Sequence, residues 1–234
     1  MDPLGYRGCR VPRLLSIQVG KPRRLGGGGG TELWDKPWRS AFWKSPVSGP
    51  VHVGRTNLDG DRQADLRVHG GPDMAILCYS ADHYPAWRAE LELPEMGPGG
   101  FGENFTVEGL DEWTACIGDV YSIGKVVVQV SQPRGPCFKI GYRWQRADLL
   151  RKVEESGRHG WYLRVLVEGS VEAGLPFDLT ERPHPEWTVR RAMDVYRAKA
   201  HDTAAAAELA RLPEYAHTPR RQLELALMRA GLQA

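Results

Sequence analysis

The chain has 234 residues, enough to bury one large hydrophobic core or one large and one small core. Its content of 41% hydrophobic and 26% charged residues is ordinary for a globular protein. Its formal net charge of +2 gives no overall attraction to a polyanion, so nucleic acid is not an expected partner. No apolar run is long enough to cross a bilayer, so no membrane partner is expected either.

Four cysteines, Cys9, Cys78, Cys116 and Cys137, are widely spaced and form no CxxC pair. This spacing argues against a zinc ribbon and against a dense disulfide framework. The first 13 residues mix Arg, Gly and Pro and lack the apolar segment of a signal peptide. We therefore expect a cytoplasmic protein whose thiols are reduced.

The first expected element is a strand over residues 14–19, where apolar and polar side chains partly alternate. The five consecutive glycines Gly26 to Gly30 follow it. A phosphate-binding loop ends in Lys-Ser/Thr and leads into a helix, and neither follows Gly30. The tract therefore predicts a flexible surface loop and an insertion.

Short strand-like runs recur after this loop, separated by Gly, Asp and Pro clusters. They cover residues 51–53, 75–79, 104–107, 120–123, 126–130 and 161–167. Only two helices are expected among them, one capped by Ser80 and running through Leu91, the other from Ala147 to Ser156 and closed by Gly157. Many short strands with turns between them favour a β-barrel or a sandwich over βαβ repeats.

The pattern of apolar residues changes to a helical period near the C-terminus. Three amphipathic helices are expected, the first capped by Thr188, the second opened by Asp202 or Thr203 and the third opened by Thr218-Pro219. The sequence thus predicts a mainly β domain with some α-helix over residues 13–183 and a small three-helix domain over residues 186–233.

The stretch from Gln132 to Lys139 places Cys137 in a turn between two permanent cations, Arg134 and Lys139. Two prolines stiffen this turn. Nearby positive charge lowers a cysteine pKa and favours the thiolate, which binds soft metals and attacks electrophiles. A lone cysteine is also commonly a small buried hydrophobe, so the residues alone leave both interpretations open.

Two further stretches carry candidate site residues. His69 directly precedes Gly70-Gly71, where backbone N–H groups can approach an anion closely. Glu103 and Asn104 follow Gly102 and supply an acceptor and an amide. Taken singly, each stretch is equally well explained by a turn, with a structural histidine in one and an amide that satisfies local backbone groups in the other.

Together these stretches closely resemble the MOSC domain, named for the C-terminal part of molybdenum cofactor sulfurase. The matching motifs are Gly60-Asp61-x-Gln63-Ala64-Asp65-x-x-x-His69-Gly70-Gly71-x-Asp73, Gly102-Glu103-Asn104, Gly118-Asp119-Val120 and Gln132-Pro133-Arg134-x-Pro136-Cys137-x-Lys139. The resemblance covers roughly residues 13 to 231 and is to the YiiM-like branch, which adds a C-terminal three-helix domain. It implies a MOSC-type β-barrel followed by those helices.

The resemblance also implies a function. YiiM-like proteins are associated with a molybdenum cofactor (molybdopterin) and with the pyridoxal phosphate-independent reduction of N-hydroxylated compounds, such as hydroxylaminopurine base analogues, to amines. This chain carries no evident flavin or iron–sulfur site, so a separate electron-donor reductase is expected as a partner. The alternative is a metal-free sulfur carrier or transfer protein with a persulfide on Cys137.

The same resemblance assigns expected roles to single residues. Cys137 is the expected metal ligand or sulfur-handling thiol, because a thiolate suits a soft metal centre. His69 is the expected proton donor, since its ordinary pKa lies near neutrality, and Glu103 is the alternative. Contacts to the cofactor are expected from Arg134, Lys139, Arg55, Asn104 and the backbone of Gly71.

One residue departs from the family pattern. The family motif commonly has a Lys after the Asp, whereas this chain has Met74, so its cofactor affinity or substrate range can differ. The C-terminal helices make a poor DNA-recognition surface, because Ala204 to Ala207 lack polar side chains. The residues leave open whether these helices form a lid on the barrel or a homodimer surface.

Overall fold

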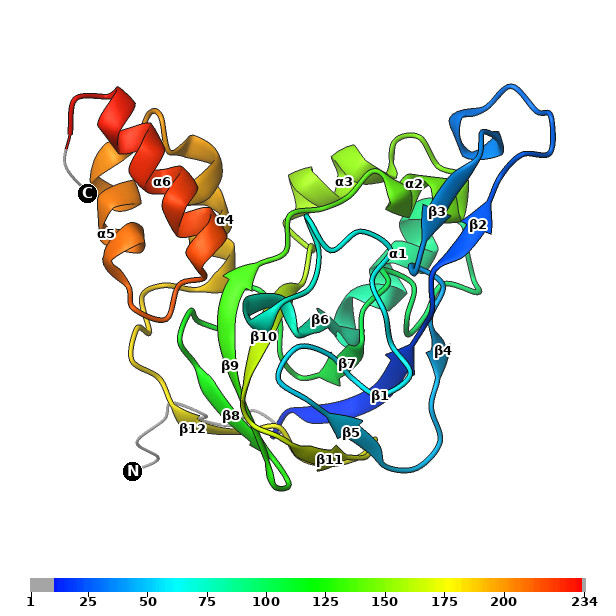
Figure 1. The fold of residues 1–234 in the computed structure, drawn as a ribbon, viewed down its shortest axis with the longest axis horizontal. Coiled ribbons are helices and arrows are strands. Elements are labelled where there is room, and N and C mark those ends of the chain that lie inside the picture. The colour runs from blue at the N-terminus through cyan, green and yellow to red at the C-terminus, as the bar shows by residue number, and fades with distance from the viewer. Residues whose placement is uncertain (1–10, 233–234) are drawn as a thin grey trace.

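The computed structural model describes residues 11–232 (Figure 1). Cys9, most of the N-terminal segment and residue 233 of the predicted helical domain lie outside the described residues. Within residues 11–232, no helix is both long enough and apolar enough to span a bilayer.

An eight-stranded sheet forms the centre of the molecule and curls into a half-barrel (Figure 1). Its strand order is β12-β8-β9-β10-β6-β7-β1-β4, and all neighbouring strands are antiparallel except the parallel pair β6–β7. The strands of this sheet are β1 Arg13–Val19, β4 Ser45–Pro46, β6 Ile76–Ser80, β7 Phe105–Glu108, β8 Val120–Ile123, β9 Val126–Pro133, β10 Trp161–Val167 and β12 Asp178–Glu181. The expected β-rich architecture is confirmed.

Two short strand pairs complete the β-structure. The first joins β5 (Val51–Val53) to β11 (Gly169–Val171), and the second joins β2 (Arg23–Leu25) to β3 (Trp38–Ser40). The glycine tract lies between β2 and β3, and all five of its glycines are exposed. It is therefore a surface loop, as its sequence predicts.

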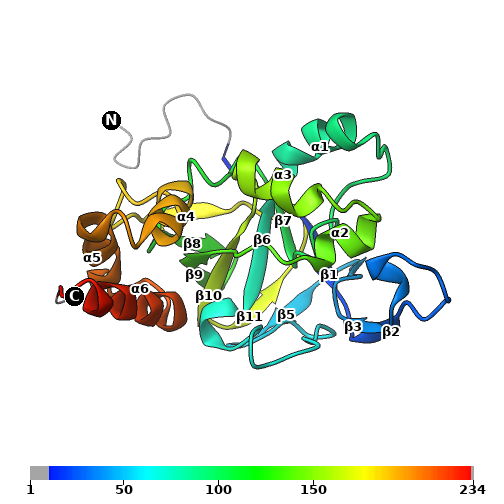
Figure 2. The same ribbon diagram turned by 90° about the horizontal axis from the view of Figure 1, so that it is seen from above.

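Three helices lie together beside the sheet: α1 (Tyr84–Leu91), α2 (Lys139–Trp144) and α3 (Leu149–Ser156) (Figure 2). The Ser80 hydroxyl accepts a hydrogen bond from Asp82 N at 3.3 Å and caps the 3-10 turn Ala81–His83 before α1. The expectation of only two helices here is wrong, because a further helix, α2, begins at Lys139, two residues after Cys137. Six residues are too few to show a helical period, and buried Ile140 anchors α2 through tertiary packing.

The C-terminal helices α4 (Val189–Ala198), α5 (Thr203–Arg211) and α6 (His217–Arg229) form a separate group against the edge of the half-barrel (Figures 1 and 2). Thr188 caps α4 by accepting from Arg191 N at 3.1 Å, and Asp202 caps α5 by accepting from Ala205 N at 3.1 Å. Both caps are as predicted.

Helix α6 begins at His217, one residue earlier than the sequence predicts. The N-cap residue, Ala216, has no side chain that can accept a hydrogen bond. Instead, the carboxylate of Asp73 accepts from His217 N at 2.9 Å. The cap of α6 therefore comes from the half-barrel, which no local pattern in the helix could have revealed.

Two hydrophobic cores hold these elements together. The larger core joins the inner face of the sheet to apolar side chains of α4, α5 and α6. The smaller core lies between β6 and helices α1 to α3, where the rings of Tyr79 and Phe101 stack with centroids 4.3 Å apart.

Candidate functional site

A pocket opens beside Cys137 and has a volume of about 720 Å³, including the space open to solvent. Its walls come from distant parts of the sequence, within residues 40–44, 62–77, 101–104 and 134–139, together with Tyr162. We call it the basic pocket, for the charges described next.

The basic pocket brings together five of the residues that the sequence singles out: Cys137, His69, Asn104, Arg134 and Lys139. These residues belong to three of the motifs and are separated by up to 70 positions. Glu103, Gly71 and Arg55 do not line the pocket. The sequence missed Lys44, Arg62 and Tyr162, which do.

The pocket is lined by basic side chains and no carboxylate. Its ionisable residues other than Cys137 and Tyr162 are Lys44, Arg62, His69, Arg134 and Lys139. Arg62, Arg134 and Lys139 converge without a carboxylate in the lining and produce a positive potential inside a partly enclosed space. The pocket is therefore suited to a ligand that carries phosphate or another anionic group.

Arg134 is held firmly at this site and is only 3% exposed. Its backbone N–H donates to Gly160 O at 3.0 Å, and its guanidinium donates to His159 O at 3.4 Å. Gly160 N in turn donates to the buried carboxylate of Glu112 at 2.5 Å. No ion pair to Arg134 is found within residues 11–232, so its charge remains available to a ligand.

Lys44 enters the pocket as half of a buried ion pair with Asp61. Its side chain is 8% exposed and that of Asp61 is fully buried. Burial lowers the pKa of Lys44, and the Asp61 carboxylate opposes this shift. Asp61 also accepts from Gly20 N at 2.8 Å, which ties the pair to the end of β1.

Cys137 differs from the other two cysteines that the structure describes. Cys78 and Cys116 are buried in the fold, and burial raises the pKa of both thiols, that of Cys116 to about 12. Cys137 is partly exposed and lines the basic pocket just before α2. Its neighbour Lys139 donates to Arg39 O at 3.1 Å, which leaves the remaining N–H groups of its ammonium for a ligand.

His69 is partly buried beside the two cations. Burial lowers its pKa, and the charges of Lys139 and Arg134 lower it further. The imidazole is therefore neutral at pH 7 in the absence of a bound anion. A neutral imidazole still carries one N–H that can donate a hydrogen bond.

Glu103 faces the protein interior and is fully buried. Its carboxylate accepts hydrogen bonds from Gly99 N at 2.6 Å, Phe101 N at 3.0 Å and Thr106 Oγ1 at 2.9 Å, and also from the Tyr84 hydroxyl. Four donors fill its acceptor sites. The carboxylate therefore organises the loop before β7, and its side chain does not reach the basic pocket.

Asn104 lines the pocket while its amide bridges two strands. Its Oδ1 accepts from Leu77 N at 3.1 Å and its Nδ2 donates to Gln18 O at 3.2 Å. Arg55 lies elsewhere and donates to Val165 O at 3.0 Å. Gly71, with φ of 88°, begins the 3-10 turn Pro72–Met74, and Gly70 lines the pocket in its place.

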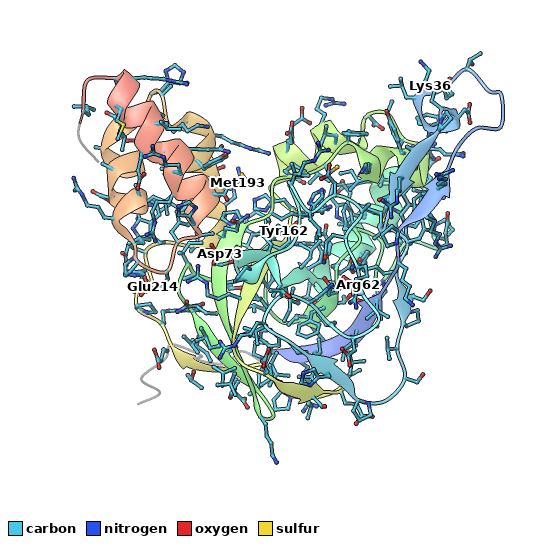
Figure 3. All side chains as sticks on the ribbon, in the orientation of Figure 1. Lys36, Arg62, Asp73, Tyr162, Met193 and Glu214 are labelled. Atoms are coloured by element: carbon cyan, nitrogen blue, oxygen red, sulfur yellow. The ribbon has the colours of Figure 1, made fainter. Side chains whose placement is uncertain are left out.

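A second pocket, the helix crevice, lies between the half-barrel and the C-terminal helices. It is lined by Val68, His69, Met74, Gln132, Pro133, Gly135, Tyr162, Met193, Tyr196, Tyr215, Thr218, Pro219 and Gln222. Tyr162 from β10 and Met193 from α4 are labelled in Figure 3, on the two sides of the junction between sheet and helices. The helix crevice shares His69, Met74, Gly135 and Tyr162 with the basic pocket, so the two pockets are contiguous.

Comparison with known proteins supports the resemblance seen in the motifs. The model of the MOSC domain matches residues 65–178. The uncharacterised protein YflK of Bacillus subtilis (strain 168) is 43% identical over 169 residues, covering 72% of this chain and 73% of YflK. A protein named "Reductase" from Gibberella moniliformis is 37% identical over 206 residues, which cover 86% of this chain and only 35% of that longer protein.

The fold agrees with a solved structure. The crystal structure of YiiM from Geobacillus stearothermophilus superposes with a TM-score of 0.76 and 32% sequence identity, over 92% of this chain and 99% of that one. The similarity in fold and sequence thus extends over nearly the whole length of both chains. The protein belongs to the MOSC domain family, in its YiiM-like branch.

Proposed function

We propose that this protein binds a molybdenum cofactor in the basic pocket and reduces N-hydroxylated compounds to amines. One observation carries the proposal: the thiol of Cys137 lies in a pocket whose other ionisable side chains, apart from Tyr162, are basic. A thiolate is a suitable ligand for a soft metal, and the surrounding cations suit the phosphate of a pterin cofactor. The residues present therefore fit this group.

Single residues would have distinct tasks in this site. Cys137 would hold the metal, while Arg134, Lys139 and Lys44 would hold the cofactor phosphate. His69 would donate its remaining N–H to the bound anion or to the substrate oxygen. Met74 adds no charge where the family motif commonly has a lysine, so the other basic side chains of the lining would supply the positive charge.

The overall reaction consumes two electrons and two protons: the N–O bond of R–NHOH breaks, and the products are R–NH2 and water. The cofactor, when bound, supplies the two-electron chemistry. The electrons would come from a separate reductase. Membership of the MOSC family and the reductase name of the longer fungal relative support this class of chemistry.

The decisive experiment is metal analysis of protein purified from two hosts, one able and one unable to make molybdenum cofactor. Molybdenum and pterin should be present only from the first host and should be lost in Cys137→Ser. Cys116→Ser is the matched control, because Cys116 is buried away from the pocket. Reduction of hydroxylaminopurine by metal-free protein would refute the proposal.

A second candidate is supported by the same thiol. Cys137 is partly exposed and lies beside cations. A cysteine that carries a persulfide needs both features, because the sulfur must be accessible and the thiolate must be favoured. In a metal-free sulfur carrier, intact-mass spectrometry would find one extra, reducible sulfur on Cys137 and no bound molybdenum. The metal analysis above separates the two candidates directly.

A further inference from the structure

Glu112 is a buried carboxylate that the proposed chemistry does not use. Its side chain lies outside the basic pocket and is fully buried, and no Lys or Arg of the described residues forms an ion pair with it. Its Oε2 lies 2.6 Å from Nε2 of His83, and its Oε1 accepts from Gly160 N at 2.5 Å. A buried carboxylate is costly unless hydrogen bonds stabilise it, so these two contacts hold it in place.

The peptide between His159 and Gly160 lies between this carboxylate and a cation of the basic pocket. Its N–H, on Gly160, donates to Glu112, and its C=O, on His159, accepts from Nη1 of Arg134 at 3.4 Å. The two hydrogen bonds therefore act on opposite ends of one planar amide. Each bond polarises the amide in the sense that strengthens the other. The peptide thus couples the buried carboxylate to the guanidinium.

Gly160 gives this turn a conformation that favours glycine. Its φ is +82°, and a Cβ at this position would lie 2.6 Å from Cys78 O. Its own carbonyl accepts from Arg134 N at 3.0 Å and lies 2.9 Å from Nδ1 of His159. Because a carbonyl can only accept, Nδ1 carries the proton. The turn therefore presents two carbonyls to Arg134, and the bond to Glu112 fixes their orientation.

Arg134 has no direct counter-charge in the fold. It is 3% exposed and forms no ion pair within residues 11–232, and a buried guanidinium without an anion is costly. Burial lowers the pKa of His159, the charge of Glu112 opposes this shift and the charge of Arg134 adds to it, so both charges act on the same ring. Glu112 therefore offsets the charge of Arg134 across one peptide and leaves the guanidinium able to bind a ligand.

We propose that Glu112 is a positioning residue for the basic pocket: through the His159–Gly160 peptide, it holds the guanidinium of Arg134 where that group binds an anion. The identity of the anion as a cofactor phosphate rests on the proposed function, but the binding of a phosphate ion does not. Loss of the hydrogen bond from Gly160 should weaken anion binding. Loss of the charge alone should weaken it less.

The test is an NMR titration with inorganic phosphate of the full-length protein, purified from a host that makes no molybdenum cofactor. Glu112→Met keeps the side chain unbranched but removes the acceptor for Gly160 N–H, and we expect the Kd for phosphate to rise about tenfold. Glu112→Gln keeps an acceptor without the charge and should raise the Kd roughly threefold or less. Because both substitutions remove one charge, the difference between them measures the hydrogen bond.

Asp119→Asn is the matched control. Asp119 is also fully buried, accepts from Cys116 N at 2.9 Å, pairs with Arg182 and does not line the pocket. Its substitution should destabilise the protein but change the Kd for phosphate by less than about twofold.

A double-mutant cycle distinguishes positioning from a general loss of structure. In the Arg134→Met background, Glu112→Met should cause no further loss of phosphate affinity, because the group that it positions is absent. If Glu112→Met does not fold, Glu112→Asp takes its place, since the shorter side chain withdraws the carboxylate from Gly160 while the charge stays. Its loss of affinity should likewise disappear in the Arg134→Met background.

Four results would overturn the inference. They are no binding of phosphate to the wild type, a Kd of the Glu112 variants within about twofold of the wild type, an equal loss in Asp119→Asn, and an undiminished loss in the Arg134→Met background. The metal analysis tests the proposed function separately. If phosphate binding depends on Glu112 but the protein never holds molybdenum, the proposed function fails while the role of Glu112 stands.

Discussion

The carboxylate of Asp73 accepts a hydrogen bond from the backbone N–H of His217 at 2.9 Å and joins the half-barrel to the first turn of α6. Its other oxygen accepts from the Arg164 guanidinium at 2.7 and 3.0 Å. Asp73 immediately precedes Met74, which lines both pockets. One side chain therefore positions the C-terminal helices beside the site.

Asp73→Asn should destabilise this junction. The substitution removes the charge that pairs with Arg164 and weakens the cap of α6, so we expect unfolding free energy to fall by about 1–3 kcal/mol. Urea denaturation measures this change, and amide exchange should increase first in the first turn of α6. Asp194→Asn is the control, because the exposed Arg190–Asp194 pair within α4 should contribute less than about 1 kcal/mol.

The pKa of His69 should respond to its cationic neighbours. Burial, Lys139 and Arg134 hold this pKa below its ordinary value of 6.5, so Lys139→Met should raise it. Inorganic phosphate should raise it too by offsetting the cations in the pocket. An NMR titration of the imidazole follows both effects, and Lys125→Met, an exposed substitution in the β8–β9 turn, should leave the His69 pKa unchanged. An unchanged His69 pKa in Lys139→Met would contradict the described geometry.

The buried pair of Lys44 and Asp61 permits a test that separates stability from ligand binding. Lys44→Met leaves a buried carboxylate without its cation and should cost about 3–5 kcal/mol. The double variant Lys44→Met, Asp61→Asn removes both charges and should recover most of that stability. It should not recover phosphate affinity, as measured by calorimetry, because the pocket still lacks one cation. Full recovery of affinity would exclude Lys44 as a ligand contact.

Glu112 should make stability depend on acid pH. Burial alone would raise the pKa of Glu112. The pKa is instead lowered below its ordinary value of 4.5 by the hydrogen bond to His83 at 2.6 Å, by the charges of His83 and His159, and by the N–H of Gly160. A depressed carboxyl pKa contributes stability above the unfolded value, and this is lost as pH falls through the folded pKa. The stability difference between the wild type and Glu112→Gln should therefore shrink below about pH 4.5. Thermal unfolding at pH 7 and at pH 4 would measure it.

Local patterns predicted the elements that local interactions determine. A short strand-like run predicted a strand over 120–123, and cap residues predicted that α4 starts after Thr188 and that α5 starts at Asp202 or Thr203. Helix α6 begins one residue earlier than the sequence predicts. The group that caps it is the carboxylate of Asp73, which lies 144 positions away in the sequence. Helix α2 was missed because it is short and is stabilised by tertiary packing.

The site was predictable to the extent that its residues lie in recognisable motifs. Cys137, Arg134, Lys139 and His69 were found in this way, and the structure brings them into one pocket. Motifs do not show which way a side chain points. Glu103 was therefore predicted as a candidate proton donor, although its carboxylate is directed into the interior. Lys44 and Tyr162 have no motif, and only the folding of distant strands brings them to the pocket.

The segment just before β12 is hydrogen-bonded to the start of β1, with consequences for the order in which the chain can fold as it is made. Phe177 N donates to Pro12 O at 2.8 Å, and Leu14 N donates to Leu175 O at 3.0 Å. On a ribosome, the hydrogen bonds at the start of the first strand must therefore wait for some 160 residues of later synthesis.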